Sequence, residues 1–174
     1  MDNLFNQVVN QQDAIRKLLG KIPGFKGYFE RENRRSSDKL LRDMLAARFE
    51  ETWGRISSLQ RDLITQGAIS MIDDLEAAAV KLRQVIDRVK SASYGYSGFF
   101  DAVKINEKEL ELIYNYDLAM MDQVDAVTHA IDNVETSIGT DGLPAAIRNL
   151  TAAAETCVSV FNKRGDVITN STAQ

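Results

Sequence analysis

The stretch EKELELIYNYDLAMMDQVDAVTHAIDNVETSI, residues 107–138, repeats an apolar position every three or four residues over about four heptads. The repeat begins at Leu110, passes through Asp117 and ends at Ile138. Such spacing places one continuous stripe on one side of a helix, and a stripe of this length needs partner helices to cover it. Asn106, with Glu109 three residues later, is close to a capping box and predicts where the helix begins. The stretch therefore predicts a long helix that packs lengthwise against others.

Three more long helices are predicted by the same spacing, over residues 30–66, 68–91 and 143–165. Gly67 separates the first two, residues 139–142 separate the last two, and Pro144 suits the first turn of the final helix. A shorter amphipathic helix is expected over residues 2–19, with Gly20 as its stop. The expected buried stripes are Leu41, Leu45, Phe49, Trp53, Ile56, Leu59 or Gln60, and Leu63; Ile69, Ile72, Leu75, Ala79, Leu82, Ile86 and Val89; Met121, Val124, Val127, Ile131 and Val134; and Leu143, Ile147, Leu150, Ala154, Val158 and Phe161.

Short connections between these helices favour antiparallel neighbours. The predicted fold is all-α: an antiparallel, up-down-up-down four-helix bundle of long amphipathic helices with an additional short N-terminal helix. Residues 1–165 form a single domain, because a chain of 174 residues buries one sizeable core. Residues 166–174 are polar, lack periodicity and are predicted to be a flexible C-terminal tail. A three-helix coiled coil with separate appendages is the less favoured alternative.

The composition of the chain indicates its cellular compartment and the kind of partner it binds. Cys157 is the only cysteine, which excludes an intramolecular disulfide and favours a reducing compartment. The N-terminus has no basic segment followed by an apolar run, and no stretch reaches the ~20 apolar residues that span a bilayer. A cytoplasmic location is expected. The formal net charge of −4 disfavours a strongly basic nucleic-acid binder.

Charge is distributed unevenly along the chain, and this predicts a contact surface. Ten basic and four acidic residues lie between Arg16 and Arg48, a segment that contains a loop rich in glycine and aromatic residues at 20–29. A second such loop follows at 94–100, and the predicted topology gathers both loops with the start of the helix over 30–66 at one end of the bundle. Arginine and aromatic side chains favour interfaces. The candidate partner-binding or anion-binding residues are Lys21, Phe25, Lys26, Tyr28, Phe29, Arg31, Arg34, Arg35, Lys39, Tyr94, Tyr96, Phe99 and Phe100.

A structural alternative explains the same residues: the aromatic side chains cap the core, and the arginines pair with Glu107, Glu109 and Glu111 at the same end. Even then an anion could compete, because exposed ion pairs contribute only ~0–1 kcal/mol. The acidic stretch from residue 107 to 155 is interpreted as a solvated face.

No residue pattern supports catalysis or a cofactor. His129 has Asp125 and Asp132 at helical spacing, but one helix supplies too few metal ligands, so we interpret His129 as a solvated surface residue. Cys157 stands among alanines and is expected to be a buried core thiol. Asp117 occupies a stripe position, so it must be paired or neutral; we expect it to bond a tyrosine or arginine of a facing helix and to fix the register of the helices.

Two functions are compatible with this pattern. The preferred one is a non-enzymatic interaction or scaffold module that self-associates or docks a protein partner through the basic, aromatic-rich end. The alternative is a peripheral binder of anionic surfaces through the basic N-terminal segment, with membrane headgroups favoured over nucleic acid. No small-molecule substrate, metal or cofactor is expected.

Overall fold

The computed structural model describes residue 17, residues 20–21, 34–95 and 107–172, with side chains described for 17, 20–21, 41–91 and 115–166. Four long helices make up this part of the chain: α3 (Arg34–Thr65), α4 (Ile72–Gly95), α6 (Glu107–Ser137) and α7 (Leu143–Thr172), with the short 3-10 helix η1 (Ile69–Met71) before α4. Every element in these ranges is helical, which confirms the predicted all-α class. None of the helices described has both the length and the apolarity that a bilayer-spanning segment requires.

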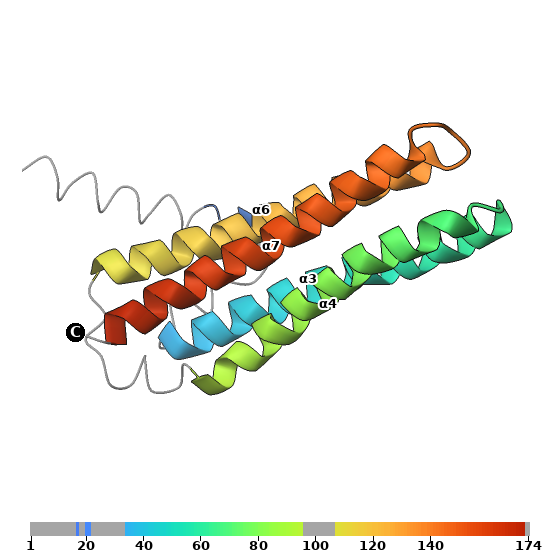
Figure 1. Ribbon diagram of the computed structural model, residues 1–174. Helices are drawn as coiled ribbons and strands as arrows, with labels where there is room; N and C mark the ends of the chain where they lie inside the picture. Colours follow the sequence, from blue (N-terminus) through green and yellow to red (C-terminus); the bar gives the residue numbers. More distant parts are fainter. Residues whose placement is uncertain (1–16, 18–19, 22–33, 96–106, 173–174) are drawn as a thin grey trace, which may run out of the picture.

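The helices form two hairpins, α3 with α4 and α6 with α7 (Figure 1). Gly67 and Gly139 reverse the chain with φ angles of 77° and 79°, a backbone region that glycine enters without a steric penalty. The amide of Ala68 donates to the Leu63 carbonyl at 2.9 Å and so closes the first turn. A Cβ added at Gly139 would lie 3.5 Å from Oε1 of Gln66, so the two turns adjoin each other. Both predicted chain reversals are therefore confirmed.

Each long helix has two neighbours around a shared core. The helix α3 packs on α4 and α6, and α7 packs on α4 and α6. Trp53 Nε1 of α3 donates to the carbonyl of Ala79 on α4 at 3.1 Å. Lys81 of α4 reaches Glu155 of α7 with its Nζ 3.0 Å from Oε1. The first contact closes the α3–α4 hairpin, whereas the second connects the two hairpins, which lie side by side.

The core is one cluster of buried apolar side chains contributed by all four long helices. Ile69 departs from the predicted stripes with 63% of its surface exposed, because it lies in the single turn of η1 at the end of the bundle. Trp53, Ile72, Val158 and Phe161 are only partly buried. Gln60 and Ile138 are also only partly buried. All other predicted stripe residues with described side chains are buried: Leu41, Leu45, Phe49, Ile56, Leu59, Leu63, Leu75, Ala79, Leu82, Ile86, Val89, Asp117, Met121, Val124, Val127, Ile131, Val134, Leu143, Ile147, Leu150 and Ala154.

Three predicted helix ends are wrong. The helix α7 continues past Gly165 to Thr172, because Arg164 is buried and paired within the bundle and a single internal glycine costs only about 1 kcal/mol. The helix α4 continues to Gly95, so Tyr94 belongs to its last turn and not to a loop. Gly20 does not stop the leading segment, since both Gly20 and Lys21 are helical.

Candidate functional site

The predicted basic and aromatic site is described only in part. The starts of α3 and α6 and the ends of α4 and α7 lie at the end of the molecule opposite the two turns (Figure 1). Arg34, Arg35 and Lys39 lie in the first turns of α3, and Tyr94 lies in the last turn of α4, so the structure brings the backbones of these four residues to that end. Outside the described residues lie Phe25, Lys26, Tyr28, Phe29, Arg31, Tyr96, Phe99 and Phe100.

Lys21 is the one predicted site residue whose side chain is described, and it is engaged within the chain. Its Nζ donates to Oδ1 of Asp122 at 2.7 Å and to Oδ2 of Asp125 at 3.0 Å, both on α6. The hydrogen bond to Asp122, followed by that to Asp125, raises the pKa of Lys21 above its ordinary value. Arg48 of α3 donates to the Lys21 carbonyl at 3.3 Å. For Lys21, the internal ion pair of the structural alternative therefore applies, although its partners were not the glutamates expected.

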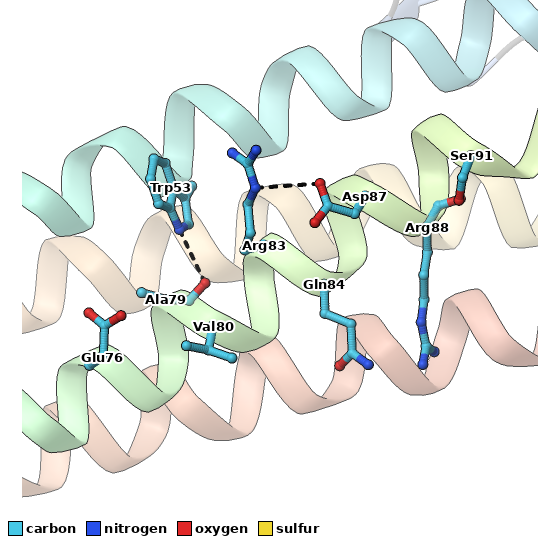
Figure 2. A pocket seen from close by; sticks show the side chains of 9 residues that line it. All are labelled: Trp53, Glu76, Ala79, Val80, Arg83, Gln84, Asp87, Arg88 and Ser91. Atoms are coloured by element: carbon cyan, nitrogen blue, oxygen red, sulfur yellow. Dashed lines mark hydrogen bonds and ion pairs between the residues drawn. The ribbon is translucent and has the colours of Figure 1, made fainter.

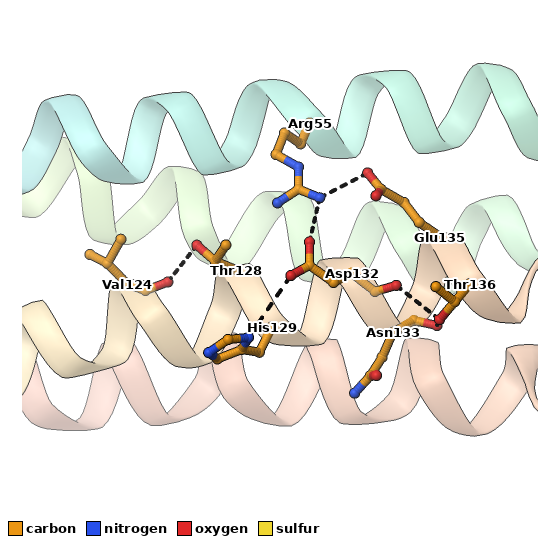
Figure 3. A network of polar contacts seen from close by, with 8 residues as sticks. All are labelled: Arg55, Val124, Thr128, His129, Asp132, Asn133, Glu135 and Thr136. Carbon is orange, nitrogen blue, oxygen red and sulfur yellow. Dashed lines mark hydrogen bonds and ion pairs between the residues drawn. The ribbon is translucent and has the colours of Figure 1, made fainter.

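Cross-helix ion pairs continue along the same face of α6 (Figure 3). Arg55 of α3 lies 2.6 Å from Oδ1 of Asp132 and 2.9 Å from Oε1 of Glu135, and the hydrogen bond to Asp132 is the first cause of its raised pKa. His129 is 81% exposed in its side chain, with Nδ1 3.9 Å from Oδ2 of Asp132, which confirms it as a surface residue. Four carboxylates of this acidic stretch lie at the surface, as expected of a solvated face, but they also pair with the basic side chains of Lys21 and Arg55: Asp122, Asp125, Asp132 and Glu135.

The interior of the bundle contains a polar pair. Arg164 Nε of α7 donates to Oδ1 of Asp117 on α6 at 2.6 Å, and the two residues are only 2% and 1% exposed. The expectation that Asp117 bonds an arginine or tyrosine of a facing helix is confirmed. Arg164 was missed, although it continues the stripe of the last helix seven residues beyond Cys157. Arg42 of α3 is also buried, at 6% exposed.

In the part of the chain whose side chains are described, neither Cys157 nor the histidine and acidic side chains are arranged for nucleophilic catalysis or metal binding. Cys157 is fully buried, and burial raises the pKa of its thiol to about 12, which confirms a core thiol that stays protonated at neutral pH. Among the residues that the structure describes, no three histidine, cysteine or acidic side chains gather as a metal site would require.

The outer seam between α3 and α4 carries an open hollow of about 690 Å³ (Figure 2). Trp53 projects into it from α3, while the other lining residues come from α4. The guanidinium carbon of Arg83 lies 5.4 Å from the Trp53 ring centroid, within the range of a cation–π contact, and Arg83 Nε is 3.4 Å from Oδ1 of Asp87. Val80, beside them, is 59% exposed. The hollow thus offers an apolar surface rimmed by charge.

The hollow was not predicted from the sequence, because Trp53 was expected to lie in the core stripe of α3. The available signal was Val80, an apolar residue on the otherwise polar side of α4. Comparison with known proteins found no matching family model, curated protein or solved structure.

Proposed function

We propose that this chain is a non-enzymatic helical interaction module that docks a protein partner or a second copy of itself. The observation that supports this function best is the hollow on the α3–α4 seam, where Trp53, Val80 and Arg83 lie together at the surface. Tryptophan and arginine are the residue types that contribute most often to the binding energy of protein interfaces. Because Val80 is exposed and Arg83 already orders the Trp53 ring, the surface is preformed and loses little side-chain entropy on binding.

The roles of the reactive side chains agree with this proposal. The thiol of Cys157 is inside the core, Asp117 is paired with Arg164, and His129 is exposed with one distant carboxylate. Catalysis by a cysteine or histidine needs a nucleophile and a base within hydrogen-bond reach of each other. Neither Cys157 nor His129 has such a partner in the part of the chain described with side chains.

The complete architecture that we propose for this module is an up-down-up-down bundle with an additional N-terminal helix. The two glycine turns and the side-by-side hairpins support it. In this arrangement the basic, aromatic-rich end is a second contact surface, formed by the starts of α3 and α6 and the ends of α4 and α7. Binding of anionic membranes through the N-terminal basic segment is the less favoured function, because Lys21 is already paired with Asp122 and Asp125.

The test compares capture of partners by the full-length chain and by two surface variants. Val80→Glu places a charge in the hollow, and Ile64→Glu is its matched control, since Ile64 is an exposed apolar residue, 55% accessible, near the turn end of α3. Circular dichroism and thermal unfolding establish that each variant is folded. Sedimentation velocity over a range of concentrations measures self-association, and affinity capture with mass spectrometry measures binding of other proteins.

We expect the wild-type chain either to self-associate or to capture a specific protein. That binding should be lost in Val80→Glu and kept in Ile64→Glu. A third variant, in which Arg34, Arg35 and Lys39 are changed to glutamate, tests the basic end in the same assays. If all variants behave as the wild type does, neither surface is a docking site. Binding of the wild type to anionic vesicles alone, abolished by salt, would instead favour the membrane function.

A further inference from the structure

The outer face of α4 carries one ridge of side chains that runs through the hollow on the α3–α4 seam. Residues four apart on a helix form such a ridge, slightly inclined to the helix axis. This ridge has an acidic start, an uncharged middle and a basic end, and all its members line the hollow: Glu76, Val80, Gln84 and Arg88 (Figure 2). Val80 is 59% exposed, so the ridge offers a partner an apolar contact between two opposite charges.

The two charged ends of the ridge have only neutral partners within the described part of the chain. Oε2 of Glu76 accepts a hydrogen bond from the amide Nε2 of Gln60 on α3 at 2.6 Å. Nη1 of Arg88 donates to the amide oxygen Oδ1 of Asn162 on α7 at 2.7 Å. Because neither amide carries a charge, both Glu76 and Arg88 can still form an ion pair with another molecule.

The charge pattern of the ridge identifies the partner that fits it. A partner must bring a cation to Glu76 and an anion to Arg88, which lie twelve residues or about 18 Å apart along α4. The ridge itself has this pattern when it runs in the opposite direction. A two-fold axis at the level of Leu82, midway along the ridge, places Glu76 of each copy beside Arg88 of the other. Two helices packed by ridges of this kind cross at about −50°, the commonest arrangement in globular proteins.

We propose that the partner of the α3–α4 hollow is a second copy of this chain, docked antiparallel along the same ridge about a two-fold axis. This inference rests on the proposed function, because it names the partner of the same surface. The symmetry forms the ion pair between Glu76 and Arg88 twice and brings Val80 of both copies into the contact. A parallel arrangement would instead oppose Glu76 to Glu76 and Arg88 to Arg88. Since the ridge has no net charge, it does not favour nucleic acid or an anionic membrane.

Charge-reversal variants of the full chain test the proposal. Glu76→Arg gives a ridge with two cations and Arg88→Glu gives a ridge with two anions, so each variant should repel its own copies. An equimolar mixture of the two variants should associate, because both ion pairs then form again, and a chain with both substitutions should associate by itself. The matched controls are Asp62→Arg and Arg61→Glu, the same changes at exposed residues of α3 outside the hollow. Circular dichroism and thermal unfolding establish that each variant is folded.

Sedimentation equilibrium measures the dissociation constant of the dimer from about 1 µM to about 1 mM, a range that suits the small contact area of two crossing helices. We expect a wild-type dimer and a dissociation constant raised about tenfold or more in each single variant. The mixture, the doubly substituted chain and both controls should return the wild-type value. Isotope labelling of one variant in the mixture allows native mass spectrometry to identify the dimer as a heterodimer.

Three results would overturn the inference: a wild type that stays monomeric over this range, single variants that associate as the wild type does, and a mixture that forms no heterodimer. A monomeric wild type that captures another protein, and loses it in Val80→Glu, would leave the proposed function in place. If Val80→Glu changes neither self-association nor capture, the hollow is not a docking site and both ideas fail there.

Discussion

Replacing Asp117 by leucine should lower the free energy of unfolding by about 3–5 kcal/mol while leaving the protein folded. The carboxylate and the Arg164 guanidinium are 2.6 Å apart and almost fully buried, so the variant leaves a buried cation without this partner. Two unit charges 4 Å apart attract by about 4 kcal/mol at an effective dielectric constant of 20. A domain is stable by about 5–15 kcal/mol, so the fold should survive the loss.

A double-mutant cycle separates the ion pair from other effects of the substitution. Urea unfolding, followed by far-ultraviolet circular dichroism, is measured for Asp117→Leu, Arg164→Met and the double variant. The double variant should be more stable than either single variant, because it leaves no buried charge from this pair. Asp62→Leu, the same change at an exposed carboxylate of α3, is the control and should change the free energy of unfolding by about 0.5 kcal/mol or less.

Two results would refute this reasoning. If each single variant loses less than about 1 kcal/mol and the double variant loses their sum, then Asp117 and Arg164 are not coupled. If Asp117→Leu fails to fold at all, the carboxylate does more than hold α6 and α7 in register.

Other substitutions test the turns, the buried thiol and the exposed network. Gly67→Ala and Gly139→Ala should each lower the free energy of unfolding by about 1–2 kcal/mol. The cause is the positive φ angle alone, since no neighbouring atom approaches an added Cβ closer than 3.5 Å. Gly54→Ala, inside α3, should instead raise the thermal stability of the protein, because alanine favours a helix more than glycine does. The thiol of Cys157 should react with a thiol reagent only as fast as the protein unfolds around it. Because burial raises the pKa of this thiol from 9.0 to about 12 in the folded state, the free energy of unfolding should fall as pH rises through this interval. Arg55→Ala should lower the free energy of unfolding by no more than about 1 kcal/mol, because its carboxylates are about half exposed, and the loss should shrink in high salt.

The sequence predicted the helices and most of the core, because burial of a stripe on a helix requires a repeat that is visible in the residues themselves. Gly67 and Gly139 marked the reversals for the same reason, since only glycine enters their backbone conformation easily. The end of α7 could not be predicted locally, because the pairing of Arg164 with Asp117 depends on a residue 47 positions away.

The surface was less predictable than the core. Cations and carboxylates pair across helices according to the rotation of each helix about its axis, which the spacing of apolar residues fixes only coarsely. Lys21 and Arg55 therefore found partners on α6 that sequence analysis had treated as solvated. Trp53 packs against the core as predicted, but it is only partly buried, because a large ring at the edge of a stripe can face the core and the solvent together.

Both glycine turns lie at one end of the bundle, so the described chain consists of two similar helical hairpins, α3–α4 and α6–α7. Lys81 pairs with Glu155 and Arg88 bonds Asn162, each 74 positions along, so α4 and α7 run parallel and no short loop could connect them. The α3–α4 hairpin is complete before the α6–α7 hairpin is synthesised, and the apolar sides of the two hairpins pack into one core. We therefore expect that a chain divided between residues 95 and 107 and co-expressed as two fragments will reassemble and copurify, which would make this protein usable as a split reporter.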